Sequence, residues 1–181
     1  MVKFSQIAIP LFIISIMVFS VIGFMWGGSL EEDNTNQKDE YGLTKINDKW
    51  ILEKEGTQYV FDYHPSELTE IPVEPFTIDS PKYYLIFDPE DKDNNMDYSL
   101  GKLYYTLNQF NLQVFLACSK EEGCELDIPI KDCSEKSFYF KKAEKINVYL
   151  GDNCIVIEGD NQGLSKTVDK LGYLFLGVIN G

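Results

Sequence analysis

The chain lacks arginine: all 16 of its basic side chains are lysines, and they face 29 acidic side chains, which gives a formal net charge of −13. Arginine supplies the rigid, bidentate group with which proteins grip phosphates and guanine edges. An acidic domain without arginine repels the nucleic-acid backbone. The composition therefore predicts that the protein has no nucleic-acid partner.

The sequence is also poor in catalytic signatures. It contains one histidine, His64, and none of the G-x-S-x-G, H-E-x-x-H or P-loop motifs of common hydrolases and nucleotide-binding enzymes. We therefore predict no cofactor. A hydrolase remains an alternative if two of the many carboxylates form an acid/base pair, or if His64 activates a nucleophile.

A long apolar segment is present near the amino terminus. Residues 7–26, IAIPLFIISIMVFSVIGFMW, contain no charged side chain, and a helix of this length spans ~30 Å, the thickness of a bilayer's hydrocarbon core. Lys3 precedes the segment, and Glu31, Glu32 and Asp33 follow it. We therefore predict that residues 1–26 form a single-pass anchor in the cell membrane. Because positive charge stays on the cytoplasmic side, the amino terminus is expected inside the cell.

A cleaved signal peptide is the alternative, with VIG, which ends at Gly23, as the cleavage site. The apolar region of a signal peptide is usually shorter, about 7–15 residues, so the continuous run to Trp26 favours an uncleaved anchor. Residues 27–41 are polar, without periodicity, and predict a flexible linker. Both alternatives place residues 42–181 outside the cytoplasm as one domain.

The domain begins with the pattern of a β-hairpin. Apolar and polar residues alternate from residue 42 to residue 63, and Tyr59, Phe61 and Tyr63 repeat with a period of two. The glycine in EKEG places the turn near Glu55–Gly56. The proline-rich stretch that follows, residues 64–76, predicts at most one helical turn and an extended connection.

A parallel βαβ unit is predicted in the middle of the chain. The runs YYLIFD, residues 83–88, and LQVFLAC, residues 112–118, are short and apolar, as in buried strands. The segment between them places apolar side chains on one helical face, namely Leu100, Leu103, Tyr104 and Leu107. A helical crossover of this length connects parallel strands with right-handed topology.

The carboxy-terminal part predicts a second hairpin and a second helix. KINVYL and CIVIEG flank the turn signal Gly-Asp-Asn, and the final helix has Ser165 as its expected N-cap. From Leu171 onward this helix is apolar nearly all round, so it is either buried or carries a docking face, for which the candidate partner-facing residues are Leu174, Leu176 and Ile179. The predicted fold class is α+β, one domain with a mixed sheet and two principal helices.

Four cysteines, Cys118, Cys124, Cys133 and Cys154, raise three alternatives. Their intervals are too long for the short C-x-x-C knuckles of structural zinc sites, and a reactive thiol would need a neighbour such as His64. An even number outside the cytoplasm predicts two disulfides. Sequential and nested pairings stabilise similarly, by ~6 kcal/mol in the loop-entropy model, so the connectivity stays open, although the topology favours the sequential pairing.

An acidic loop resembles the start of a calcium site. The alternating positions of an EF-hand loop are matched at their beginning by Asp91, Asp93, Asn95 and Asp97. Met96 stands where the loop needs glycine, and Lys102 where it needs the bidentate glutamate. A weak extracellular calcium site is therefore an alternative to an acidic loop that caps the following helix at Asp97.

Three stretches, YVFDYHPSEL, CELDIPIKDC and DNCIVIEGDNQGLSKTVDKLGYLFLGVI, resemble small single-pass proteins of the archaeal envelope. The resemblance rests on aromatics, cysteines and a closing helix. It implies an anchor followed by one extracytoplasmic domain and implies no particular activity.

Three functions follow from the sequence. A membrane-anchored extracytoplasmic binding or accessory domain, stabilised by disulfides and engaging an envelope protein partner, is favoured. The alternatives are an envelope hydrolase that uses carboxylates and a sensor module that binds a small solute or cation. A concave pocket with converging carboxylates would favour the hydrolase, and an exposed apolar surface would favour the binding domain.

Overall fold

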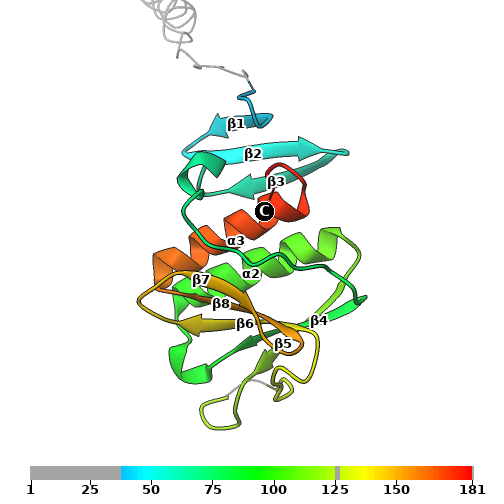
Figure 1. Cartoon of the computed structure of the whole chain (residues 1–181), viewed down its shortest axis with the longest axis vertical. Helices are drawn as coiled ribbons and strands as arrows, with labels where there is room; N and C mark the ends of the chain where they lie inside the picture. The colour runs from blue at the N-terminus through cyan, green and yellow to red at the C-terminus, as the bar shows by residue number, and fades with distance from the viewer. Residues whose placement is uncertain (1–37, 125–126, 181) are drawn as a thin grey trace, which may run out of the picture. The chain divides into compact units, whose positions relative to one another are not determined.

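The computed structural model of the chain describes residues 38–124 and 127–180 (Figure 1). They belong to a compact unit that runs from Lys38 to Gly181, so residues 38–41, which the sequence assigns to the linker, are part of the domain. The predicted anchor over residues 7–26 lies outside the described residues. Within them, no helix is both long enough and apolar enough to cross a bilayer.

A small antiparallel sheet opens the domain, with strand order β1-β2-β3. Its strands are β1 (Leu43–Ile46), β2 (Lys49–Lys54) and β3 (Thr57–Phe61). Each of its two turns uses a pair of residues with positive φ, Asn47–Asp48 and Glu55–Gly56, which is the type I′ geometry that matches the twist of paired strands. The hairpin predicted around Glu55–Gly56 is confirmed. The first turn, which has no glycine, was not predicted.

A larger mixed sheet has strand order β5-β4-β6-β8-β7. Its strands are β4 (Lys82–Phe87), β5 (Gln113–Cys118), β6 (Ser137–Lys142), β7 (Asn147–Leu150) and β8 (Cys154–Gly159). The neighbours β5, β4, β6 and β8 are parallel, and β7 is antiparallel to β8. The βαβ unit and the second hairpin are therefore confirmed, and the α+β class with a mixed sheet and two helices holds. The small sheet corrects the expectation of a single sheet.

The helix α2 (Asn94–Gln109) begins earlier than predicted. Asp93, not Asp97, is its N-cap: Asp93 Oδ1 accepts hydrogen bonds from the backbone amides of Asn95 and Met96 at 3.0 and 2.9 Å. A carboxylate at this position satisfies amides that the first turn leaves unpaired. The short 3₁₀ turn η2 (Pro89–Asp91) precedes it.

The helix α3 (Asn161–Phe175) also starts before its predicted cap. Asp160 Oδ1 accepts a hydrogen bond from the amide of Gly163 at 2.6 Å, so Asp160 replaces Ser165 as the N-cap. A Cβ at Gly163 would lie 2.6 Å from Cγ1 of Ile146. The glycine is therefore required for close packing.

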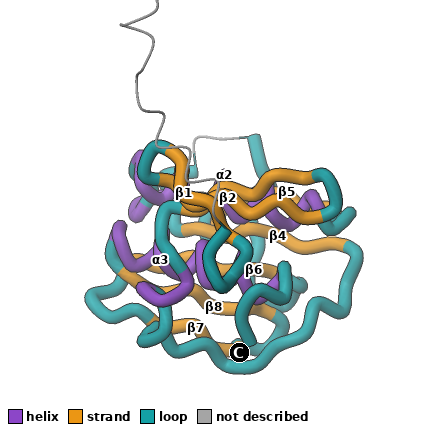
Figure 2. Tube along the Cα trace, turned by 90° about the horizontal axis from the view of Figure 1, so that it is seen from above, coloured by secondary structure: helices purple, strands orange, loops and turns teal. Residues whose placement is uncertain are grey.

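The two helices lie between the two sheets, so the domain has three layers (Figure 1). Figure 2 looks down on these layers from above, so that they overlap in the view. Between the helices and the large sheet, a main cluster of buried side chains includes Leu85, Phe87, Leu103, Phe138, Phe140, Ile157 and Leu171. On α2, the predicted leucines are buried, but Tyr104 is 43 % exposed and Met96 takes the inner position. Tyr104 is therefore a correction to the predicted apolar face.

The helix α3 is apolar nearly all round because it contacts both sheets. Leu164, Val168 and Leu171 belong to the main cluster. Tyr173 and Leu176 belong instead to a second cluster with side chains of the small sheet, among them Leu43, Leu52, Tyr59 and Phe61. Burial on both sides, rather than a docking face, accounts for Leu176, which is 3 % exposed.

Gly172 allows α3 to approach the small sheet closely. A Cβ at this position would lie 2.8 Å from Cε1 of Phe61, and the Phe61 ring is itself stacked on Tyr173 with 3.9 Å between ring centroids. The ring therefore has little freedom to move away. A Cβ placed on Gly101, on the exposed side of α2, would have no atom within 4 Å.

The two helical glycines are expected to respond to alanine with opposite signs. Gly172→Ala overpacks the contact with Phe61 and should lower the free energy of unfolding by about 1–3 kcal/mol. Gly101→Ala meets nothing and should raise it by roughly 0.5–1 kcal/mol through helix propensity. Urea denaturation measures both. A Gly172→Ala variant as stable as Gly101→Ala would contradict the packing of α3 against β3.

Candidate functional site

All four cysteines form disulfides, in the sequential pairing. Cys118 is bonded to Cys124 and Cys133 to Cys154, with Cα atoms 6.2 and 5.1 Å apart. The first closes a local loop at the end of β5, and the second joins the loop before β6 to the start of β8. For loops of 6 and 21 residues the chain-entropy model gives ~2 and ~3 kcal/mol. Neither a zinc cage nor a free thiol is formed.

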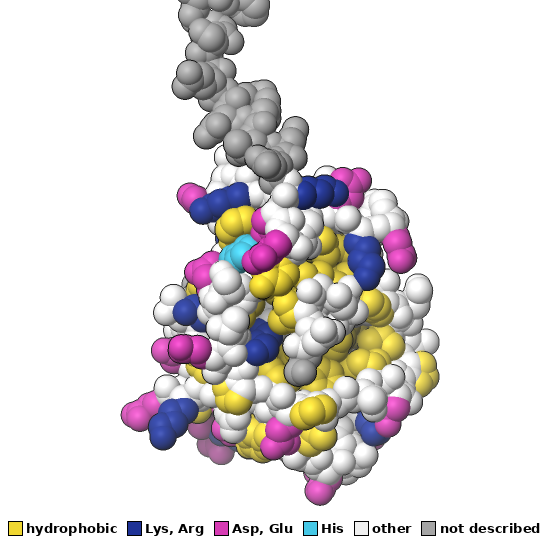
Figure 3. All heavy atoms as spheres, turned by 45° about the horizontal axis from the view of Figure 1, so that its top comes forward, with side chains coloured by type: hydrophobic (Ala, Val, Ile, Leu, Met, Phe, Trp, Pro, Cys, Tyr) yellow, Lys and Arg dark blue, Asp and Glu magenta, His cyan; other side chains and the backbone are white. Residues whose placement is uncertain are grey.

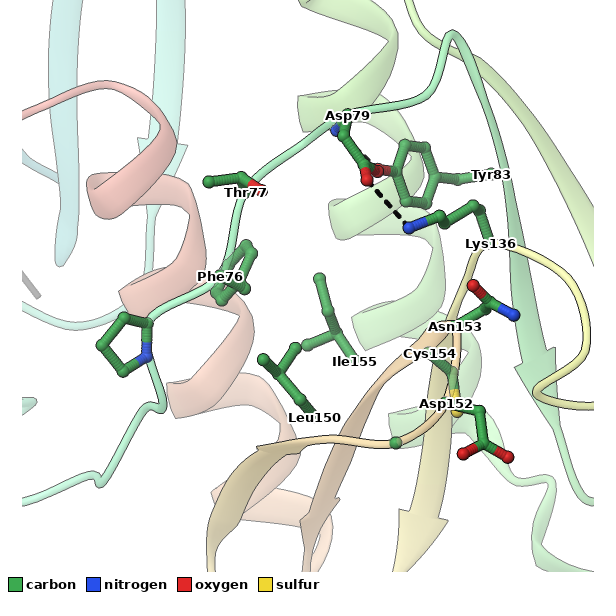
Figure 4. Close-up of a pocket in the computed structure, with 12 residues that line it drawn as sticks. Phe76, Thr77, Asp79, Tyr83, Lys136, Leu150, Asp152, Asn153, Cys154 and Ile155 are labelled. Carbon is green, nitrogen blue, oxygen red and sulfur yellow. Dashed lines mark hydrogen bonds and ion pairs between the residues drawn. The ribbon is translucent and has the colours of Figure 1, made fainter.

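A cavity of about 340 Å³ lies beside the second disulfide, between the extended segment of residues 73–79 and the β7–β8 turn. We call this segment the connector. Phe76, Leu150 and Ile155 face the cavity from one side, and Asp79, Tyr83 and Lys136 close its other end (Figure 4). Leu150 is 48 % exposed. A concave surface that combines an apolar wall with a few convergent polar groups is typical of binding sites.

The polar end of this cavity is an ion pair. Lys136 Nζ lies 2.9 Å from Asp79 Oδ2, and the Tyr83 hydroxyl donates to Asp79 Oδ1 at 3.2 Å. The hydrogen bond from Lys136 lowers the pKa of Asp79 below its usual range and raises the pKa of Lys136. Both side chains are therefore charged at neutral pH, and they lie at one end of a pocket whose lining also includes Thr77, Asp152 and Asn153.

The disulfide holds the floor of this cavity in place. The amide of Asn153 donates to the carbonyl of Cys133 at 3.1 Å, and the amide of Ser137 donates to the carbonyl of Asn153 at 3.1 Å. The Cys133–Cys154 bond adds a covalent link between the same two segments. The β7–β8 turn is thereby fixed to the start of β6.

A second cavity, of about 390 Å³, also lies against the connector and is lined by its residues together with the end of α3. Leu174 and Ile179, two of the predicted partner-facing residues, line it together with Phe76 and Phe175. Leu174 and Ile179 are half-buried, and Phe76 packs edge-on against Phe175 with 5.9 Å between ring centroids. Leu174 and Ile179 therefore reach a surface hollow that Leu176 does not line.

The strongest charge cluster of the domain is centred on Asp169 of α3, whose side chain is fully buried. Asp169 Oδ2 accepts hydrogen bonds from the backbone amides of Asp62 and Tyr63 at 2.7 and 2.9 Å. Asp169 Oδ1 forms an ion pair with the ammonium of Lys102 on α2. The side chain therefore joins α3, α2 and the end of β3.

Lys102 links Asp169 to a second carboxylate, Asp62. Lys102 Nζ lies 2.7 Å from Asp62 Oδ2, the Tyr98 hydroxyl donates to the same oxygen at 2.9 Å, and Lys49 pairs with Asp62 Oδ1. Burial raises the pKa of Asp169 to about 6, although Lys102 opposes the shift. Burial also acts on Asp62, but the hydrogen bonds from Lys102 and Lys49 outweigh it and hold its pKa at about 2.

Two carboxyl groups with separated pKa values are the signature of acid/base catalysis. In such a pair, both groups must reach the substrate. Asp169 has no exposed surface, and its Oδ2 is occupied by two backbone amides. The separation of the pKa values therefore reflects the assembly of the fold rather than a hydrolytic site. The sequence did not single out Asp62, Lys102 or Asp169.

His64 lies in a short hydrogen-bonded chain with a serine and an aspartate. Its Nδ1 is 2.7 Å from Ser66 Oγ, and its Nε2 is 2.6 Å from Asp39 Oδ2. The rings of Trp50 and Tyr41 lie 4.5 and 5.3 Å from the imidazole. In the space-filling view the histidine lies beside both acidic and apolar side chains (Figure 3).

These three hydrogen-bonded side chains are of the types found in a nucleophilic triad, but their geometry is that of a helix N-cap. His64 is the N-cap of η1 (Pro65–Glu67), and its Nδ1 also accepts from the amide of Ser66 at 3.3 Å. Asp39 in turn accepts from the amide of Leu43 at 2.7 Å. The three side chains therefore attach the residues before β1 to the turn after β3.

The acidic loop uses its side chains for other contacts. Asp93 caps α2 and pairs with Lys142 at 2.6 Å, and Asp97 lies 3.3 Å from Lys92. In the part of the chain that the structure describes, no cluster of three or more histidine, cysteine or acidic side chains is placed to hold a metal ion. Asp91 and Asn95 do not join Asp93 and Asp97 in such a cluster, so the calcium hypothesis gains no support.

Comparisons with known proteins add no relative: no protein-family model, no curated protein and no solved structure matches the chain.

The pKa of Asp169 predicts an unusual pH dependence of stability. Because the folded-state pKa, about 6, lies above the ordinary value of 3.8, the folded state binds the proton more tightly. Tighter proton binding raises the free energy of unfolding by on the order of 3 kcal/mol at a pH below the unfolded-state pKa. This stabilisation is lost as the pH rises through about 6. Asp169→Asn should remove this decline, as measured by urea denaturation between about pH 4 and pH 7.

The exposed Asp79 provides the matched control, since Asp79→Asn should keep the decline. The lowered folded-state pKa of Asp79 changes the free energy of unfolding in the opposite direction, because the stabilisation that it gives is lost as the pH falls. Identical pH profiles for the wild type and Asp169→Asn would contradict the buried, ionisable state of Asp169.

Proposed function

We propose that residues 38–181 form an extracytoplasmic binding domain of the cell envelope, tethered to the cell membrane by a single-pass anchor over residues 7–26. The domain acts as an accessory module that engages a partner protein and catalyses no reaction itself. The observation that carries the proposal is the connector, whose residues line two cavities, of about 340 and 390 Å³.

Two features support the location. Residues 7–26 have the length and composition of a membrane span, with acidic residues after them. All four cysteines are paired in disulfides, which persist in oxidising compartments outside the cytoplasm. The two features are independent of each other, and both favour a domain on the outer side.

The connector has the properties of a surface that receives a partner's chain. It is extended, with Phe76 and Ile78 half-buried and Thr77 and Asp79 exposed. Prolines within and beside the connector favour this conformation, so little conformational entropy is lost when a partner binds. An apolar side chain of the partner would contact Leu150 in one cavity or Ile179 in the other.

The charges around the first cavity would select the partner. Asp79 and Lys136 form an exposed ion pair at its mouth, and a polar rim around an apolar centre is the usual anatomy of a protein interface. The partner segment is therefore expected to present an apolar side chain flanked by a charged one. Rim charges of this kind contribute to specificity and association rate more than to affinity.

A charge placed on the apolar wall should abolish capture of the partner. Leu150 lies at the end of β7 and is 48 % exposed, so Leu150→Asp should fold normally and lose partner capture by roughly tenfold or more. The measurement is affinity capture of the full chain from native membranes after mild crosslinking, with each captured protein quantified by mass spectrometry.

The matched control is Ile46→Asp, on β1 of the small sheet, where the isoleucine is 46 % exposed. Proteins captured by the wild type and by Ile46→Asp, and lost with Leu150→Asp, would be partners of the connector surface. Capture of the bait alone, or equal capture by all three chains at equal thermal stability, would contradict the proposal.

A further inference from the structure

A third cavity, of about 650 Å³, lies where the amino-terminal turns of α2 and α3 meet the end of β3. Its lining contains amide, hydroxyl, lysine and carboxylate side chains and two tyrosines, and no aliphatic residue among those that the structure describes. These side chains differ from the aliphatic ones that line most ligand pockets, although carbon atoms contribute more of the exposed lining than polar atoms do. The cavity is separate from the two cavities beside the connector.

One part of the lining is fixed by its own hydrogen bonds. Asp62 is bonded to Lys102 and to the Tyr98 hydroxyl, and it pairs with Lys49. Lys102 in turn is held by the buried Asp169. The back wall of the cavity is therefore a preorganised polar network whose side chains need not reorient when a ligand arrives.

The other part of the lining has unused hydrogen-bonding capacity. Asn95, Gln162 and Ser165 line the cavity, and their side chains have no hydrogen bond or ion pair within the described part of the chain. Asn95 and Gln162 are exposed. Each amide offers two donors and an acceptor, and each hydroxyl offers both functions.

The same lining argues against other ligand classes. An apolar ligand would find apolar atoms there but no aliphatic side chain, and it would leave the polar groups of the lining without partners. A simple anion would meet the Asp62 carboxylate, whose pKa of about 2 keeps it ionised, and a simple cation would meet the ammonium of Lys49. A neutral ligand with many hydroxyl groups satisfies donors and acceptors of both kinds at once.

We propose that this cavity binds a saccharide. The ring hydroxyls would pair with the side chains of Asn95, Gln162 and Ser165, while Asp62 keeps its hydrogen bonds to Lys49, Lys102 and Tyr98. Tyr63 and Tyr98, which also line the cavity, offer rings with an apolar body and a polar tip against which the C–H face of a sugar packs.

The site binds and does not hydrolyse. Asp169, the second carboxyl of the network, lies behind Lys102 and has no exposed surface, so it cannot reach a glycosidic bond from the cavity. Saccharides are abundant on the outer side of cell envelopes, where the proposed function places the domain. The saccharide proposal nonetheless depends on the cavity alone and survives if the connector binds no partner.

The test is a chemical-shift titration of the ¹⁵N-labelled full chain in detergent, in which the signals of the domain, residues 38–181, are followed. The probes are the methyl glycosides of glucose, galactose and mannose, and N-acetylglucosamine, each at millimolar concentration. At least one should shift the side-chain amide signals of Asn95 and Gln162. Asn95→Ala combined with Gln162→Ala should weaken that binding roughly tenfold for each hydrogen bond lost, as followed through the backbone amide signals of Tyr63 and Ser165, which also line the cavity.

Asn94→Ala provides the matched control, because Asn94 is exposed on the same helical turn but does not line this cavity; it should bind as the wild type does. Inorganic phosphate and free leucine serve as comparison probes and should leave both amide signals unchanged. No shift with any of the four sugars, equal affinity in the double variant, or a response to phosphate alone would overturn the proposal.

Discussion

The carboxylate of Asp169 joins three elements of the fold. Its Oδ2 holds the backbone amides of Asp62 and Tyr63, immediately after β3, and its Oδ1 faces Lys102 on α2. Because a buried charge without partners costs several kcal/mol, the small sheet, α2 and α3 must keep their relative positions for the network to be satisfied. The stacking of Phe61 on Tyr173 secures the same junction with apolar contacts. The polar cavity and the attachment of residues 38–43 through His64 both depend on this junction.

The sequence predicts features that depend on neighbouring residues. The turn at Glu55–Gly56, the β7–β8 hairpin and the leucine face of α2 follow from local periodicity and turn chemistry, and the disulfides follow from an even cysteine count and the anchor. The N-caps were misplaced by four or five residues, at Asp97 and Ser165 instead of Asp93 and Asp160, because several residues in each stretch can cap a helix.

The candidate sites depend on residues that are distant in sequence. Asp79 meets Lys136 across 57 positions, and the amide of Asp62 meets Asp169 across 107. One sequence of 29 acidic and 16 basic residues offers too many such pairs for charge alone to select them. The apolar closing helix shows the same limit, because its sequence pattern is compatible with both burial and docking. In the structure, contact with both sheets buries Leu176. Leu174 and Ile179 instead line the cavity beside the connector. The candidate binding surfaces therefore follow from the layer arrangement, not from motifs.

The most direct test of this account is amide hydrogen exchange at Asp62 and Tyr63 in the wild-type chain at neutral pH. Both residues lie just beyond the end of β3, where amides ordinarily exchange quickly. Bonding to the buried Asp169 predicts exchange as slow as that of the interior strand β4, through global unfolding. Exchange as fast as that of the exposed turn at Asn47–Asp48 would contradict the central role of Asp169.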